Sequence, residues 1–143
     1  VDPGARRRHQ QHPCRSRWWR GLALRPRRQD RQIHPAVAPL PNEPVVVKTA
    51  PNAFVGTDMG ERVEAAGNKQ VIVMGLMTHM CVTFTAEGAF LRGNQPTVVA
   101  DACATRPIRR GVVNVSAEVL HEGALATIAD LYAVVVRSGT SLQ

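Results

Sequence analysis

Four short apolar runs, separated by stretches of helical character, constrain the fold of this chain more than any other feature. They cover residues 45–47, 71–74, 97–100 and 133–136. These runs are rich in β-branched residues and do not alternate with polar ones, so both faces of each strand are expected to be buried. Strands of this kind, alternating with helices, are typical of a parallel sheet covered on both faces. The sequence therefore predicts an α/β domain.

Helical patterns fill the intervals between the apolar runs. Residues 59–66 and 81–91 are expected to form helices, and Thr78 is a candidate N-cap for the second of them. Ser116 is expected to cap a further helix. Residues 104–115, which precede that helix, are expected to form a loop.

Charge divides the chain into two parts. Residues 1–32 hold ten arginines and only two acids, whereas residues 33–143 carry a net charge of −1. The first part shows neither helical nor strand periodicity, and it cannot bury enough apolar area to offset the entropy of ordering it. We therefore expect a basic, irregular segment over residues 1–32 and one folded domain over residues 33–143.

Composition argues against several classes of protein. No apolar run is long enough to span a membrane, and the N-terminus lacks the apolar stretch of a secretory signal, so a cytoplasmic protein without a membrane partner is expected. The three cysteines, Cys14, Cys81 and Cys103, lack the spacing of a disulfide framework or a zinc site. We therefore expect no metal or cofactor.

Candidate chemistry lies where ligands of open parallel sheets bind, beyond the carboxyl ends of strands. Lys48, Cys81 and Asp101 each follow one of the expected strands. In the first helical turn, the helix dipole favours a thiolate at Cys81 and unpaired N–H groups can receive an oxyanion. A neighbouring Lys48 ammonium would favour the thiolate further. The alternatives are a buried structural cysteine, a surface lysine and, favoured for Asp101, a carboxylate that accepts backbone hydrogen bonds.

A family resemblance adds to this interpretation. The stretch VIVMGLMTHMCVTFTA at residues 71–86 resembles the nucleophile segment of isochorismatase-like cysteine hydrolases, a strand followed by G-x-x-T-x-x-C-V-x-x-T-A. VVVKTAPNAFVGT at residues 45–57 resembles the family's strand, lysine and Phe-x-x-Thr, and VVADACA at residues 98–104 resembles its next strand. The similarity extends from about residue 33 to residue 136, and it implies a three-layer αβα fold with a mostly parallel sheet.

The resemblance also implies a reaction and its residues. Family members of this type use a triad of Asp, Lys and Cys, so Cys81 would attack the carbonyl carbon of a small amide and form a thioester, while Lys48 holds the thiolate. A cis peptide between Leu76 and Met77 would aim the N–H groups of Met77 and Cys81 at the oxyanion. The substrate pocket would be shaped by Phe54, Thr78, His79 and Met80. Siderophore-type isochorismatases usually lack the cysteine, so its presence favours an amidase-type reaction.

One part of the family pattern is missing. The triad aspartate belongs to a D-x-Q-N-like segment on a central first strand, and this chain has no such segment; Asp2 and Asp30 lie among arginines and prolines. The sheet is therefore expected to be incomplete on its N-terminal side. Loss of a general acid or base typically costs about 10²–10⁴-fold in rate. A truncated or frame-shifted gene product is our hypothesis for residues 1–32.

Three functional hypotheses compete at this stage. The first is an active cysteine amidase that acts on a small molecule and assembles as a homo-oligomer. The second is an inactive remnant that serves at most in ligand or subunit binding. The third makes residues 1–32 a nucleic-acid-binding arm, with Trp18 and Trp19 stacking on bases. The third is disfavoured because no recognised nucleic-acid-binding motif accompanies the arginines.

Overall fold

The computed structural model describes residues 33–142. The expectations for residues 1–32, namely the irregular segment, the nucleic-acid arm and the frame-shifted origin, lie outside the described residues. Within the described part, the residues from Pro44 onward belong to one compact unit. Residues 33–43 lie outside that unit and contain one short 3₁₀ helix, η2 (Pro35–Val37).

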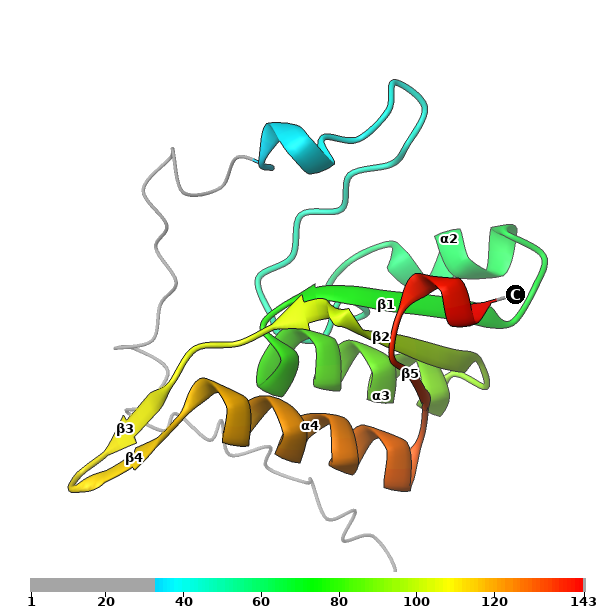
Figure 1. The fold of residues 1–143 in the computed structure, drawn as a ribbon. Coiled ribbons are helices and arrows are strands. Elements are labelled where there is room, and N and C mark those ends of the chain that lie inside the picture. Colours follow the sequence, from blue (N-terminus) through cyan, green and yellow to red (C-terminus); the bar gives the residue numbers. More distant parts are fainter. Residues whose placement is uncertain (1–32, 143) are drawn as a thin grey trace, which may run out of the picture. The chain divides into compact units, whose positions relative to one another are not determined.

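A three-stranded parallel sheet forms the centre of the unit that begins at Pro44. Its strands are β1 (Gln70–Leu76), β2 (Gln95–Ala104) and β5 (Val134–Val136), hydrogen-bonded in the order β1-β2-β5 (Figure 1). Both pairs of neighbouring strands are parallel. The predicted α/β class and its parallel sheet are therefore confirmed.

Helices lie on both sides of this sheet. In Figure 1, α3 (Thr83–Leu91) and α4 (Ala117–Leu131) lie along one face, and α2 (Met59–Ala65) lies on the other side. The last described element is a short 3₁₀ helix, η4 (Gly139–Leu142). As expected, Ser116 caps α4, because its side chain accepts a hydrogen bond from the N–H of Val119. No helix in residues 33–142 is long and apolar enough to cross a membrane.

The hydrophobic core lies between the sheet and the helices α3 and α4. Val98 at the centre of β2 and Ile128 on α4 have no exposed surface. The core cluster comprises Val73, Val82, Ala86, Val98, Cys103, Leu125 and Ile128. It holds α4 against β2 and against the segment Thr78–Val82, where the predicted nucleophile lies.

Replacing Ile128 with alanine is expected to lower the free energy of unfolding by about 2–5 kcal/mol, because the deletion leaves a cavity in a fully buried site. Leu131→Ala, on the same helix but 61% exposed, should change it by less than about 0.5 kcal/mol. Urea denaturation followed by circular dichroism measures both. Equal effects of the two substitutions would contradict the position assigned to α4.

The strand predicted at residues 45–47 is absent from the structure, so that prediction is wrong. Residues 44–48 form no strand, and the side chains of Val45 and Val47 are 54% and 79% exposed. A strand needs a hydrogen-bonded neighbour. Among the described residues, β1 pairs only with β2 and is the edge of its sheet. The apolar run therefore finds no partner in this part of the chain.

The N-cap predicted at Thr78 is also wrong. Residues Thr78–Val82 form one turn of π-helix, η3, which continues directly into α3. The residue at the N-cap of this turn is Met77, and no side-chain hydrogen bond caps it. Thr78 lies inside the turn, so its hydroxyl is available for a more distant partner.

Asp101 lies inside β2 and not after it, as was expected, because β2 continues to Ala104. The register between β1 and β2 shifts beyond Val73. Asp101 falls in this irregular stretch, with its side chain exposed and its backbone N–H donating to the Arg137 carbonyl at 2.9 Å. The shift lies between Val73 and Gly75, and the φ of 126° at Gly75 is readily adopted only by glycine.

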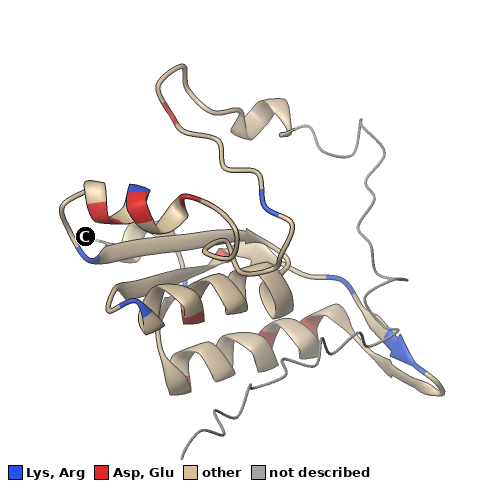
Figure 2. Ribbon diagram, turned by 180° about the vertical axis from the view of Figure 1, so that it is seen from behind, with Lys and Arg blue, Asp and Glu red and all other residues tan. Residues whose placement is uncertain are grey.

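The loop predicted at residues 104–115 contains an antiparallel hairpin, which the sequence pattern did not predict. Its strands are β3 (Ile108–Arg110) and β4 (Val113–Val115), joined by a tight turn at Gly111. The strands are only three residues long, too short for alternation to be recognised. Two of the three residues of β3 are arginines, Arg109 and Arg110, and this strand is coloured blue in Figure 2.

Candidate active site

The side chains of Lys48 and Cys81 meet just beyond the carboxyl end of β1. Lys48 Nζ lies 3.2 Å from Cys81 Sγ, and both residues are half-buried. Cys81 is carried by the π turn η3, and Lys48 by the extended segment that precedes a loop at residues 50–54. The structure therefore brings together the two residues that the sequence singled out, although 33 positions separate them.

Lys48 is held by two backbone carbonyls besides the sulfur. Its Nζ donates to the carbonyl of Ala50 at 2.9 Å and to that of Pro51 at 3.1 Å. A lysine ammonium has three N–H donors and no acceptor, so these two carbonyls and Cys81 Sγ can use all three. The sulfur is consequently the acceptor, and an acceptor facing an ammonium binds more strongly when it carries a negative charge.

The loop that supplies these carbonyls is attached to α3 through Thr85. The backbone N–H of Ala53 donates to Thr85 Oγ1 at 3.1 Å, and Thr85 Oγ1 donates to the Pro51 carbonyl at 3.4 Å. The loop also packs closely on Gly88, where a Cβ would lie only 2.5 Å from the Asn52 amide. Thr85 lies in the motif at residues 71–86, from which no role was predicted for it. Its contact with the loop is long-range and leaves no local signal.

The turn between β1 and Cys81 has the backbone that the family resemblance implied. The peptide bond between Leu76 and Met77 is cis. The Met77 carbonyl accepts hydrogen bonds from the N–H groups of Met80 at 3.0 Å and Val82 at 3.3 Å, which close the turn around Cys81. The assignment of the Met77 and Cys81 N–H groups as oxyanion donors stays a prediction.

Two of the predicted pocket residues are almost completely buried. Phe54 is 7% exposed, and the guanidinium of Arg92 lies over its ring, 5.2 Å from the centroid. Thr78 is fully buried. Met80 is half-buried. A direct contact between substrate and any of these side chains stays a prediction, and the burial of Thr78 favours a supporting role instead.

His79 joins the nucleophile turn to the end of β2. Its Nδ1 forms a hydrogen bond with the hydroxyl of Thr105, which sequence analysis did not identify. Burial lowers the pKa of His79, and the positive charge of Arg106 lowers it further. Both effects disfavour the imidazolium, so His79 is neutral at pH 7.

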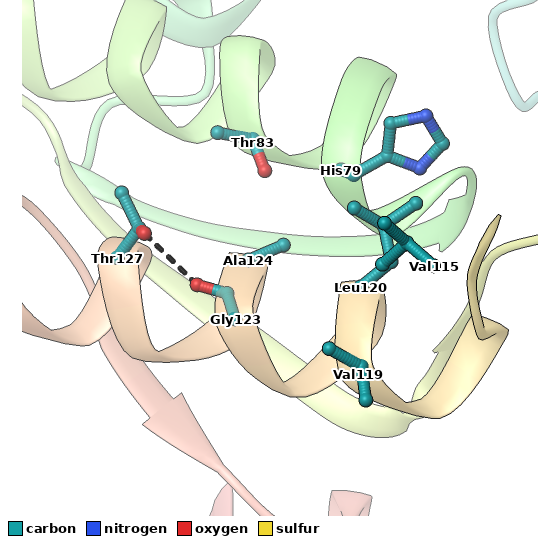
Figure 3. A pocket seen from close by; sticks show the side chains of 8 residues that line it. All are labelled: His79, Thr83, Val115, Val119, Leu120, Gly123, Ala124 and Thr127. Carbon is teal, nitrogen blue, oxygen red and sulfur yellow. Dashed lines mark hydrogen bonds between the residues drawn. The ribbon is translucent and has the colours of Figure 1, made fainter. Parts of the chain in front are cut away.

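A hollow of about 410 Å³ lies beside His79, between the η3–α3 segment and α4 (Figure 3). Its wall is mostly apolar, and Thr83 and Ala124 face one another across it in Figure 3. The lining residues are His79, Thr83, Val115, Val119, Leu120, Gly123, Ala124 and Thr127. Since neither Lys48 nor Cys81 belongs to this lining, the hollow is separate from the Lys48–Cys81 contact.

The described part of the chain contains a second free cysteine whose surroundings differ from those of Cys81. Cys103 is buried in the core, and burial raises the pKa of its thiol, although a hydrogen bond with the Gly75 backbone lowers it in part. Within residues 33–142, no lysine forms a hydrogen bond with Cys103. Cys103 is therefore a structural residue and a natural internal reference for the reactivity of Cys81.

Within residues 33–142, no carboxylate contacts Lys48 or Cys81. Lys48 Nζ forms hydrogen bonds with two carbonyls and one sulfur, and the ion pair found in these residues joins Arg62 to Asp58 on the surface. Within the same residues, no cluster of three or more His, Cys, Asp and Glu side chains could hold a metal. The aspartate that the resemblance implied is not identified among the described residues.

A half-buried cysteine in contact with a lysine at the end of a parallel strand gives this α/β domain a candidate nucleophile. The isochorismatase domain family model matches residues 5–139. The chain belongs to the isochorismatase family. It is 38% identical over 104 residues to the isochorismatase family protein YddQ of Bacillus subtilis, an alignment that covers 73% of this chain and 58% of YddQ.

Solved structures show the same relationship. An isochorismatase from Pseudomonas putida superposes with a TM-score of 0.73 at 34% identity, covering 76% of this chain and 56% of the other. The N-carbamoylsarcosine amidase of Thermoplasma acidophilum superposes with a TM-score of 0.61 at 27% identity, covering 76% and 56%. This chain spans about half the length of the curated relatives that it matches.

Proposed function

We propose that this chain is a cysteine hydrolase that cleaves a small amide or a related C–N bond through a thioester at Cys81. The observation that carries the proposal is the 3.2 Å contact between Lys48 Nζ and Cys81 Sγ at the end of β1. The similarity to an N-carbamoylsarcosine amidase supports C–N cleavage as the type of reaction. A small-molecule substrate is consistent with the family.

In the proposed mechanism, the Cys81 thiolate adds to the carbonyl carbon, so that a C–S bond forms and the carbonyl oxygen becomes an oxyanion. The N–H groups of Met77 and Cys81 are the proposed donors to that oxyanion. Collapse of the tetrahedral intermediate breaks the C–N bond, and the amine leaves with one proton. Water then attacks the thioester, which releases the carboxylic acid and restores the Cys81 sulfur.

Proton transfer is the step for which residues 33–142 are least well equipped. The leaving nitrogen needs a proton, and the proton donor in contact with Cys81 Sγ in the described structure is the Lys48 ammonium. We assign this step to Lys48, whose neutral amine then takes a proton from the water that attacks the thioester, which restores the ammonium and the Cys81 thiolate. Because no carboxylate contacts the pair in residues 33–142, we expect turnover about 10²–10⁴-fold slower than with a dedicated acid–base residue. The same observation favours the second candidate, an inactive remnant that binds a ligand or a subunit.

The proposal extends to location and assembly. The free thiols of Cys81 and Cys103 suit a reducing compartment such as the cytoplasm. Exposed apolar side chains on β1, namely Ile72, Met74 and Leu76, support burial of this face in a homo-oligomer. Size-exclusion chromatography with light scattering measures the assembly, and a monomeric mass at micromolar concentration would contradict it.

Iodoacetamide labelling at neutral pH tests the proposed nucleophile without a known substrate. Cys81 is expected to react at least about tenfold faster than Cys103, since the thiolate is the reactive form. The pKa of Cys103 is raised, so its thiol stays protonated to higher pH and its labelling should increase only as the solution becomes alkaline. Peptide mass spectrometry follows each cysteine separately. Labelling of Cys103 at or above the rate of Cys81 would refute the proposed function.

A further inference from the structure

We infer that Thr78 and His121 are positioning residues, whose hydrogen bond fixes the turn that presents Cys81 to Lys48. The inference rests on the proposed function for its catalytic meaning. Thr78 Oγ1 lies 2.8 Å from His121 Nδ1. His121 belongs to α4 and lies 43 positions after Thr78, so the bond joins the turn to a separate helix.

Both the side chain and the backbone carbonyl of Thr78 form hydrogen bonds. Thr78 has no exposed surface, so water cannot replace a lost partner of its hydroxyl. Its carbonyl accepts a hydrogen bond from Thr83 Oγ1 at 2.6 Å, which spans the π turn. Cys81 lies between these two threonines. The position of its sulfur is therefore set by a segment that is fixed at both ends.

The helix that supplies His121 is itself anchored in the core. Leu125 lies four residues after His121, one turn further along the same face of α4, and both Leu125 and Ile128 belong to the core cluster. His121 is half-buried at the edge of this cluster. The Thr78–His121 bond thus fixes η3 to a rigid part of the fold. His121 Nδ1 contacts Thr78, so we infer that it acts on Cys81 indirectly.

The surroundings of η3 show why the turn needs this support. β1, which leads into the turn, is the edge strand among the described residues, and its last residue, Leu76, is 70% exposed. On the other side, Lys48 comes from a segment that forms no strand. Because neither partner of the contact lies on a central strand in the described part of the chain, side-chain bonds such as Thr78–His121 hold the geometry.

Paired substitutions test this inference in the full chain. Thr78→Val keeps the shape but removes the hydroxyl, whereas Thr78→Ser keeps the hydroxyl. His121→Leu removes the ring nitrogen, whereas His121→Asn places an amide near the position of Nδ1. Two quantities are measured for each variant: the iodoacetamide labelling rate of Cys81 relative to Cys103, and the amide hydrogen exchange of residues 79–82.

Thr78→Val and His121→Leu are expected to slow Cys81 labelling about tenfold relative to Cys103, because small displacements at a reacting atom cost one to two orders of magnitude. Both should accelerate exchange in the turn. Thr78→Ser and His121→Asn should stay within about threefold of the wild type. General loosening of the fold would expose Cys103 as well and raise its labelling, which the positioning role does not predict.

The result that overturns the inference is unchanged labelling and unchanged exchange in folded Thr78→Val and His121→Leu. If Thr78→Val fails to fold, the comparison of His121→Leu with His121→Asn tests the inference. If His121→Leu fails to fold, the comparison of Thr78→Val with Thr78→Ser tests it. An unreactive Cys81 in the wild type would instead refute the proposed function. In that case the exchange of residues 79–82 still tests the inferred bond, so the two failures are distinguishable.

Discussion

Replacing Cys81 with serine is expected to abolish acyl transfer from 4-nitrophenyl acetate, a simple activated acyl donor. A hydroxyl is far less acidic than a thiol, and the Lys48 ammonium has no free electron pair with which to deprotonate it. Loss of an enzyme's nucleophile costs about 10⁴-fold or more, so the rate should fall to that of the donor in buffer. Release of 4-nitrophenolate, followed by absorbance, measures the effect.

Cys103→Ser is the matched control for that experiment. It makes the same chemical change at a cysteine that is buried and lacks a lysine partner in the described structure. Acyl transfer by folded Cys103→Ser should remain within about threefold of the wild type, in line with a position outside the site. Acyl transfer that survives in Cys81→Ser, or that is lost only in Cys103→Ser, would contradict the assigned nucleophile.

Replacing Lys48 with methionine is expected to slow acyl transfer and Cys81 labelling by about 10²-fold, the usual effect of removing one electrostatic partner from a reacting group. Methionine fills a similar volume but leaves the sulfur without its N–H donor. The carbonyls of Ala50 and Pro51 also lose the ammonium that now lies 2.9 and 3.1 Å from them. The labelling rate, measured on the Cys81 peptide, reports the change.

Lys48→Arg separates charge from geometry. Arginine keeps the positive charge, but its planar guanidinium cannot direct three N–H groups from one atom at two carbonyls and a sulfur. Its labelling rate should lie between those of the wild type and Lys48→Met. If Lys48→Met reacts as fast as the wild type, the ammonium does not stabilise the thiolate, and the inactive remnant becomes the better account of the chain.

Sequence patterns predicted the elements whose signals lie within their own residues, but the burial expected for both faces of β1 is wrong in the described structure, since Ile72 and Met74 are 51% and 58% exposed. The apolar run at residues 71–74 became β1, and the Ser116 cap began α4 as expected. The strand expected at residues 45–47 failed because an apolar run indicates a tendency to be buried but cannot supply a neighbouring strand. Val47 is 79% exposed for that reason.

The two reacting residues of the site could be predicted from the sequence, whereas the residues that hold them in place could not. Cys81 and Lys48 were found because a thiol and an ammonium at strand ends suggest nucleophilic chemistry. The hydroxyl of Thr78 fits an N-cap pattern locally, but His121, from a distant helix, takes it instead. The contacts of Thr85 with Pro51 and Ala53 are equally long-range. Such pairings depend on how helices pack, which no local pattern specifies.

The most direct test of the central claim is mass spectrometry of the protein quenched in acid during reaction with 4-nitrophenyl acetate. The proposed mechanism predicts one acetyl group on the Cys81 peptide, bound as a thioester that hydroxylamine removes at neutral pH. The adduct should be absent from Cys81→Ser and strongly reduced in Lys48→Met. A wild-type protein that acquires no acetyl group on Cys81, or acquires it equally on Cys103, would contradict the proposal that Lys48 and Cys81 form the reacting pair.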